Sequence, residues 1–262
     1  MKNKFGLITL AILSTSLTAC GSWYDTYKDA DKYLVGDQTY QQEISVLDID
    51  WVSGSVTLIE DSSIQGVKVE EVTTLTSEKE QVHSYLNDGE LKIKFFASGY
   101  HRSGFSSFKK DLTVTYKPGL SKINIDLTSG SLKADSITTN SFNLDVTSGK
   151  SSIGLLTSES TNIDLTSGDV EIGTVVGKDL DVDATSGSID IGFNYIEKAS
   201  FDMTSGDIKM TLPLDGGKVK VSKTSGSVTT YRDCTINGNT YTFGTGIADI
   251  NVSMTSGKVK IY

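Results

Sequence analysis

One tripeptide, Thr-Ser-Gly, returns along the second half of the chain at almost constant spacing. Its glycines are Gly130, Gly149, Gly168, Gly187, Gly206, Gly226 and Gly257, so that the successive intervals are 19, 19, 19, 19, 20 and 31. An earlier copy, V-S-G, ends at Gly54, and the step from Gly54 to Gly130 equals four intervals of 19. A fixed period of about 19 residues predicts a repeat architecture in which each copy contacts its neighbours.

Apolar residues form columns around the repeat glycines. Within each arm of the repeat, apolar and polar residues alternate, as the buried face of a strand requires. The alternation breaks across T-S-G. The residue three before the glycine and the residue two after it are mostly both apolar, although they are five residues apart and would lie on opposite faces of a straight strand. We therefore expect T-S-G to be a corner between two strands, where glycine permits positive φ and the hydroxyls satisfy turn amides. The column five residues before the glycine contains Ile49, Ile125, Leu144, Ile163, Val182, Phe201, Val221 and Val252.

These patterns predict an all-β fold, a parallel β-solenoid (single-stranded β-helix) with rungs of about 19 residues. Neighbouring rungs would stack about 4.8 Å apart. Alternation with a period of two argues against helical repeats, and a β-sandwich does not need identical corners at equal spacing. Residues 120–262 are expected to form the repeats, with a C-terminal elaboration at 231–249 around the hairpin signal Asn237-Gly238. Residues 43–119 are expected to form an N-terminal cap or opening coils.

The first residues have the pattern of an export signal. Lys2 and Lys4 precede the apolar run 5–13, and L-T-A-C follows at 17–20. This order is typical of a bacterial lipoprotein signal, in which the cysteine is lipidated and becomes the first residue. The alternative is an ordinary signal peptide with a chance cysteine. We predict a signal peptide at 1–19, the lipidated Cys20 with a tether at 20–42, and an extracytoplasmic, membrane-anchored lipoprotein.

The charge restricts the partners. The chain has 24 basic and 33 acidic residues, a net charge of −9, and loss of residues 1–19 removes two lysines and leaves a charge of −11. This argues against nucleic acid as a partner. It also means that acyl chains, rather than the protein surface, would hold the chain on the membrane. Cys234, the other cysteine, has no nearby histidine and is interpreted as a small apolar residue, not a nucleophile.

The candidate site is a column of carboxylates four residues before the repeat glycines. It contains Asp126, Asp145, Asp164, Asp183 and Asp202, with Asp50 in the early copy. In stacked rungs, the carboxylates of neighbouring aspartates would lie about 5 Å apart and repel each other by roughly 1 kcal/mol in water. Hydrogen bonds from the T-S-G hydroxyls or amides are the favoured compensation. The alternative is a bridging cation such as Ca²⁺, but the G-G-x-G-x-D nonapeptide of calcium-binding coils is missing. We therefore expect no cofactor unless Ca²⁺ occupies the ladder, and assign no metal ligands and no catalytic residues.

The aspartates belong to an outward stripe of Asn or Asp, Asp and Thr on each rung. This polar wall would suit a repeating ligand, such as a glycan, a peptidoglycan strand or an envelope protein. The alternative is that the wall is polar only because water touches it. Sugar sites usually contain aromatic platforms, and the stripe has none. Aromatic residues gather at 95–108 and 231–243, so the caps are the other candidate contact points.

The repeats resemble an adhesin-like bacterial family, domain of unknown function 4097. The resemblance covers 43–262 and is carried by three segments: D-I-D-W-V-S-G-S-V-T-L-I-E, L-T-V-T-Y-K-P-G-L-S-K-I-N-I-D-L-T-S-G-S-L-K-A-D, and G-T-G-I-A-D-I-N-V-S-M-T-S-G-K-V-K-I-Y. It implies a β-solenoid on envelope or secreted proteins. It implies no established activity and no catalytic residues.

We therefore predict a lipid-anchored, non-catalytic β-solenoid of the cell envelope that binds or senses a ligand through its polar face or its caps. The alternative is a polysaccharide-active β-helix enzyme that uses aspartates of the ladder. Against an enzyme, the acids are evenly spaced, and Arg102 and Arg232 are the only arginines. The sequence also lacks a nucleophile elbow, an H-E-x-x-H motif and a P-loop.

Overall fold

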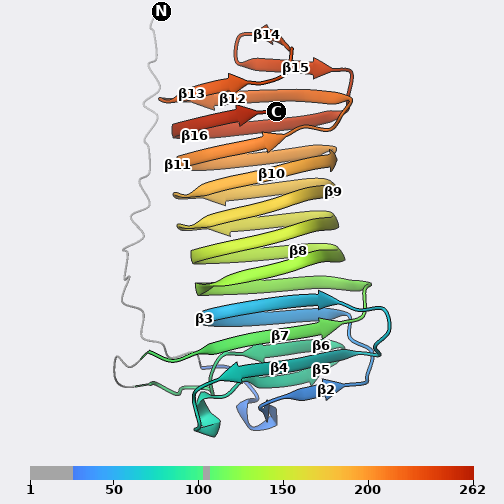
Figure 1. Cartoon of the computed structure of the whole chain (residues 1–262), viewed down its shortest axis with the longest axis vertical. Helices are drawn as coiled ribbons and strands as arrows, with labels where there is room; N and C mark the ends of the chain where they lie inside the picture. Colours follow the sequence, from blue (N-terminus) through green and yellow to red (C-terminus); the bar gives the residue numbers. More distant parts are fainter. Residues whose placement is uncertain (1–25, 103–106) are drawn as a thin grey trace, which may run out of the picture.

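A computed structural model describes residues 26–102 and 107–262 (Figure 1). The predicted signal peptide and Cys20 lie outside the described residues. The described chain contains two short 3₁₀ helices, η1 (Ala30–Lys32) and η2 (Glu78–Glu80), and one sheet of 16 strands. The first eight strands are β1 (Leu34–Val35), β2 (Gln38–Tyr40), β3 (Val46–Glu60), β4 (Val67–Thr73), β5 (His83–Asn87), β6 (Glu90–Lys94), β7 (Lys110–Tyr116) and β8 (Leu120–Leu165). The other eight are β9 (Asp169–Ala184), β10 (Ser188–Tyr195), β11 (Lys198–Thr211), β12 (Gly216–Lys223), β13 (Ser227–Thr230), β14 (Thr235–Asn237), β15 (Thr240–Gly244) and β16 (Ala248–Ile261).

The middle of the molecule is a long parallel stack in which matching residues of successive repeats lie side by side (Figure 1). Val182 of β9 pairs with Ile163 of β8 on one side and with Phe201 of β11 on the other. Each of these partners is one repeat away along the chain. The predicted all-β class and the extended parallel sheet are therefore confirmed.

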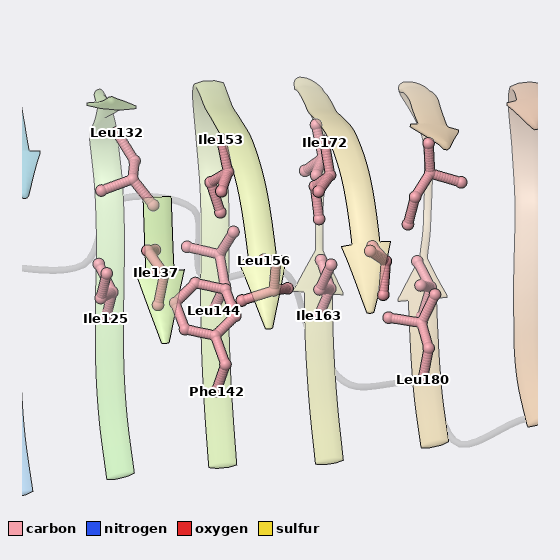
Figure 2. Close-up of a cluster of buried hydrophobic side chains, with 14 of the residues drawn as sticks. Ile125, Leu132, Ile137, Phe142, Leu144, Ile153, Leu156, Ile163, Ile172 and Leu180 are labelled. Carbon is pink, nitrogen blue, oxygen red and sulfur yellow. The ribbon is translucent and has the colours of Figure 1, made fainter. Parts of the chain in front are cut away.

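The apolar columns point into one continuous core. Figure 2 shows Ile125, Leu144 and Ile163 in one row along the stack, with a second row of Leu132, Ile153 and Ile172 beside it. All six side chains are buried. Burying a side chain of this size stabilises the fold by roughly 1.5–3 kcal/mol, so the rows together supply much of the driving force for stacking.

T-S-G lies in a bend between two strands at Gly168, Gly187 and Gly226, and within a strand at Gly130, Gly149, Gly206 and Gly257. Strands β8, β11 and β16 run through it without interruption. Gly168 has φ 132°, a value that side chains rarely tolerate. In addition, a Cβ on Gly168 would lie 2.3 Å from the carbonyl oxygen of Gly149. The repeat glycines thus stack on one another, and the close approach is a second reason for glycine besides the positive φ.

The N-terminal end does not contain the three further rungs that the long interval between Gly54 and Gly130 would allow. Gly54 of β3 pairs directly with Gly130 of β8. On its other edge, β3 pairs with two separate strands, as Asp50 lies beside Lys94 of β6 and Ser55 beside Asp111 of β7. Strands β4 and β5 pair antiparallel with β7 and β6. Antiparallel strands therefore close this end of the stack, and the described residues of 61–119 add no further full coils.

A buried charge holds this end together. The Lys110 side chain is fully buried, and its Nζ donates to the Glu71 carboxylate and to the carbonyl oxygen of Glu80 at 2.7 Å. Burial lowers the pKa of Lys110, while Glu71 acts in the opposite direction. The Lys110 Nζ also lies 4.9–5.2 Å from the ring centroids of Trp51, Phe95 and Phe96, within the range of cation–π attraction. The pair fixes β7 against β4 inside an aromatic cluster.

The C-terminal end departs from sequence order. Gly257 of β16 pairs with Gly206 of β11, and the other edge of β16 pairs with β12 and β13. The last repeat in the sequence is therefore inserted before the repeat of Gly226. The long interval makes this possible, because β14 and β15 form a hairpin that pairs antiparallel with β12 and reverses the chain. Lys223, which interrupts an apolar column, lies exposed at this end, and its Nζ donates to the Gly226 carbonyl oxygen at 2.9 Å.

Replacing Gly168 by alanine should lower the free energy of unfolding by about 3 kcal/mol or more, because backbone strain and a backbone collision act together. Gly119 is a matched control, since it has φ 107° but nothing within 4 Å of the position that a Cβ would take. Gly119→Ala should cost only the conformational part, about 1 kcal/mol. Urea unfolding monitored by circular dichroism measures both, and equal losses would show that the glycine column is not closely packed.

Candidate functional site

The structure brings the predicted aspartates into register. Asp183 pairs with Asp164 on one side and with Asp202 on the other, and Asp126 pairs with Asp50. Their carboxylates lie on the outer face of the stack. A shallow hollow of about 430 Å³ follows this face, lined by Asp145, Asp164, Leu165, Thr166, Asp183, Ala184, Thr185, Asp202 and Thr204. The part of the predicted ladder from Asp145 to Asp202 thus lines one hollow together with threonines of T-S-G.

The carboxylates of the ladder repel one another. Partial burial raises the pKa of Asp145, and the neighbouring Asp164 raises it further. The pKa of Asp183 is also raised, first by burial and then by Asp181, Asp164 and Asp202. Both shifts mean that the folded chain favours the protonated forms of these groups.

The T-S-G hydroxyls do not stabilise the ladder in the way that we expected. The Asp164 Oδ2 accepts a hydrogen bond of 2.8 Å from Asn162 Nδ2. In residues 26–102 and 107–262, Asp145, Asp183 and Asp202 accept none from T-S-G. The Ser186 hydroxyl instead donates to the backbone oxygen of Thr166 at 3.3 Å. The serine of T-S-G thus supports the bend of the neighbouring copy.

The two ends of the ladder are chemically different from its middle. Lys94 pairs with Asp50 at one end, with Nζ 3.2 Å from Oδ2. At the other end, Ser253 follows Asp202 in register. Within the described part of the chain, no group of three or more His, Cys, Asp or Glu residues is arranged to hold a metal ion. Bridging by Ca²⁺ therefore stays a prediction.

A second hollow, which sequence reasoning missed, runs along a different flank of the stack. It encloses about 330 Å³, and we call it the flank groove. It is lined by Gly119, Leu120, Thr138, Thr139, Asn140, Thr157, Ser158, Glu159, Val176, Gly177, Lys178 and Tyr195. The available signal was a column eight residues after the repeat glycines, Thr138, Thr157, Val176 and Tyr195, within the variable part of each repeat.

The flank groove is hollow because small side chains turn inward beneath it. The Thr139 hydroxyl is buried and donates to the Leu120 carbonyl oxygen at 2.9 Å. The Ser158 hydroxyl is buried in the same way and donates to the Ser160 carbonyl oxygen at 2.8 Å. Gly177 is the next member of this column. No large side chain therefore fills the space between the two rims.

The aromatic residues near the two ends of the stack differ in their exposure to solvent. Phe95 is only 3% exposed and packs against Trp51 and Phe96, so the N-terminal cluster mostly faces inward. At the other end, Tyr231 is 56% exposed and stacks on Tyr262 with ring centroids 4.3 Å apart.

Cys234 is a free, half-buried thiol. Among the described residues, no helix has the length and apolar character needed to cross a bilayer.

Replacing Asp183 by asparagine should raise the free energy of unfolding at pH 7 by about 0.5 kcal/mol, since it removes one repelling charge from an exposed ladder. The folded-state pKa of Asp183 is raised, so the repulsion is present above that pKa and fades as pH falls toward the ordinary aspartate value of about 3.9. The gain should also shrink with added salt. Thermal unfolding between pH 4 and 7 measures it, with Asp233→Asn as a control outside the ladder. A loss of stability at pH 7 would contradict the electrostatic explanation.

Comparisons with known proteins found similar solved structures and one matching family model. Two solved structures with which the chain aligns are a "putative cell adhesion protein" from Clostridium sporogenes and a "putative adhesin" from Parabacteroides distasonis. The first shares 15% identity, covers 88% of this chain and 99% of its own, and has a TM-score of 0.35. The second shares 14% identity, covers 88% and 97%, and has a TM-score of 0.46.

A third structure, a "putative lipid binding protein" from Parabacteroides distasonis, shares 13% identity, covers 87% and 97% of the two chains, and has a TM-score of 0.37. No curated protein matches the chain significantly. The family model described as Toastrack DUF4097 matches residues 50–262. The chain therefore belongs to the Toastrack family, domain of unknown function 4097.

Proposed function

We propose that this chain is a non-catalytic binding protein of the bacterial envelope, held by a lipid on Cys20. In this proposal the stack is a β-solenoid, with one T-S-G repeat in each rung, that acts as a rigid rod. Its long side faces and its ends meet an envelope protein or glycan. The rod is well suited to display, because every rung is fixed to the next by backbone pairing and by a shared core.

The observation that carries this proposal is the even distribution of polar groups along the ladder face. The carboxylates of Asp183 and Asp202 are both exposed and lie on neighbouring rungs. Hydrolysis of a glycoside needs two carboxyl groups that face one bond from opposite sides in a shaped cleft. The ladder acids instead follow one another in a single row along a shallow hollow, which does not place two carboxyl groups on opposite sides of one bond but offers a repeated contact to an extended partner.

The test uses the full Cys20→Ser chain with the signal peptide 1–19 removed, so that neither a lipid nor the apolar run 5–13 holds it on a membrane. Sedimentation with isolated cell envelopes and with purified peptidoglycan measures binding, with and without Ca²⁺. The proposal expects saturable binding and no release of soluble sugar from either material. The double variant Asp164→Asn, Asp183→Asn should change binding or stability only. Turnover that disappears in the double variant would establish the polysaccharide-active enzyme instead.

Lipid attachment at Cys20 is tested separately. In cells, the native chain should partition into the detergent phase of a Triton X-114 extract and take up labelled palmitate. Cys20→Ser should lose the label and keep the signal peptide, because lipidation of Cys20 precedes cleavage of a lipoprotein signal. Cys234→Ser is the matched control and should behave like the native chain. Aqueous partitioning of the native chain would contradict the anchor.

A further inference from the structure

The flank groove combines a recessed floor with two different rims, and it is separate from the aspartate ladder. Thr138, Thr157, Val176 and Tyr195 follow one another along one rim, each one repeat after the one before. Tyr195 pairs with Val176 in the sheet, which places them on adjacent rungs. The groove's volume of about 330 Å³ lies at the lower end of the range for small-molecule sites.

Tyr195 gives this rim the aromatic surface that the ladder lacks. Its side chain is 42% exposed although it lines a hollow. Its hydroxyl donates to Glu197 Oε1 at 2.9 Å, and this hydrogen bond orients the ring at the end of β10. An exposed and oriented aromatic ring beside aliphatic and threonine side chains provides an apolar surface with polar groups next to it.

The opposite rim is polar but carries no excess charge at its centre. Lys178 Nζ lies 2.7 Å from Glu159 Oε1, and both side chains are exposed. Asn140 occupies the equivalent position one repeat before Glu159. Their amide, carboxylate and ammonium groups are donors and acceptors for hydroxyl groups. Glu197, one repeat after Lys178, adds a negative charge beside Tyr195, so this rim repels an anionic polymer but not a neutral one.

We propose that the flank groove binds a linear, neutral polysaccharide that lies along the axis of the stack, with one sugar ring on Tyr195. The apolar rim takes the C–H faces of the sugar rings, and the Asn140–Glu159–Lys178 rim hydrogen-bonds the hydroxyl groups. Rungs spaced about 4.8 Å apart place one side chain of each rim beside each rung, so an extended chain can contact several rungs at once.

This inference rests on the proposed function as a binding protein, and it names a site and a class of ligand for it. The experiment is isothermal titration calorimetry of the same Cys20→Ser chain without its signal peptide, with two neutral probes, chitohexaose and cellohexaose. Hexagalacturonate serves as the anionic comparison. We expect saturable binding of at least one neutral hexasaccharide and at least tenfold weaker binding of hexagalacturonate.

Variants locate the binding. Tyr195→Ala should weaken the neutral hexasaccharide at least tenfold, while Tyr195→Phe, which keeps the ring and loses only the bond to Glu197, should weaken it less than threefold. Ile59→Ala is the control, because the Ile59 side chain is also 42% exposed but lines neither the flank groove nor the ladder hollow. It should bind like the native chain. Circular dichroism of each variant checks that the sheet is intact.

The outcomes separate this inference from the proposed function. Neutral sugar binding that survives Tyr195→Ala but is lost in Asp164→Asn, Asp183→Asn overturns the flank groove and leaves an envelope-binding protein that uses its ladder. Absence of binding to both neutral probes also overturns the neutral-glycan site, while binding to envelopes in the sedimentation assay would still support the proposed function. Loss of envelope binding together with retained hexasaccharide binding would overturn the proposed function alone.

Discussion

The close stacking of repeat glycines controls the rest of this structure. Each glycine from Gly149 to Gly206 has a backbone conformation that disfavours other residues, and its carbonyl oxygen occupies the place where a Cβ of the next glycine would be. Copies therefore fit on one another only when T-S-G lies on T-S-G. This register then brings Ile163 onto Val182 in the core and Asp164 onto Asp183 on the surface. The core and the ladder both follow from a single backbone contact.

The sequence was sufficient for features that repeat. Alternation around each glycine predicted the all-β class and the rows of Ile125, Leu144 and Ile163, because a strand with one buried face has a period of two. The register of the Asp column followed from the same spacing. The stacking order at the ends was not predictable in this way. The copies of Gly226 and Gly257 have the same signal, and the choice between them depends on the hairpin β14–β15 and its pairing with β12.

The chemistry of the surface was harder to predict than the fold, since it depends on where small polar side chains turn. From the sequence, we expected the hydroxyls or amides of T-S-G to bond the carboxylates, whereas the Ser186 hydroxyl donates to a backbone oxygen. The flank groove exists for a related reason. Thr139 and Ser158 bury their hydroxyls against carbonyl oxygens instead of pointing outward, and this leaves a recess. The recess could not be predicted, because threonine and serine occur as often at exposed positions.

The two side faces of the stack consequently have different capacities for recognition. On the ladder face, burial and repulsion raise the pKa of Asp145 and Asp183, so a ligand gains there mainly by supplying positive charge. On the flank groove, the Glu159–Lys178 pair is already neutral and Tyr195 supplies apolar contact, so a ligand gains by shape and hydrogen bonding. Binding on the ladder should therefore weaken strongly with salt, whereas binding in the groove should depend on salt only slightly. Ionic strength thus distinguishes the two faces without any change to the chain.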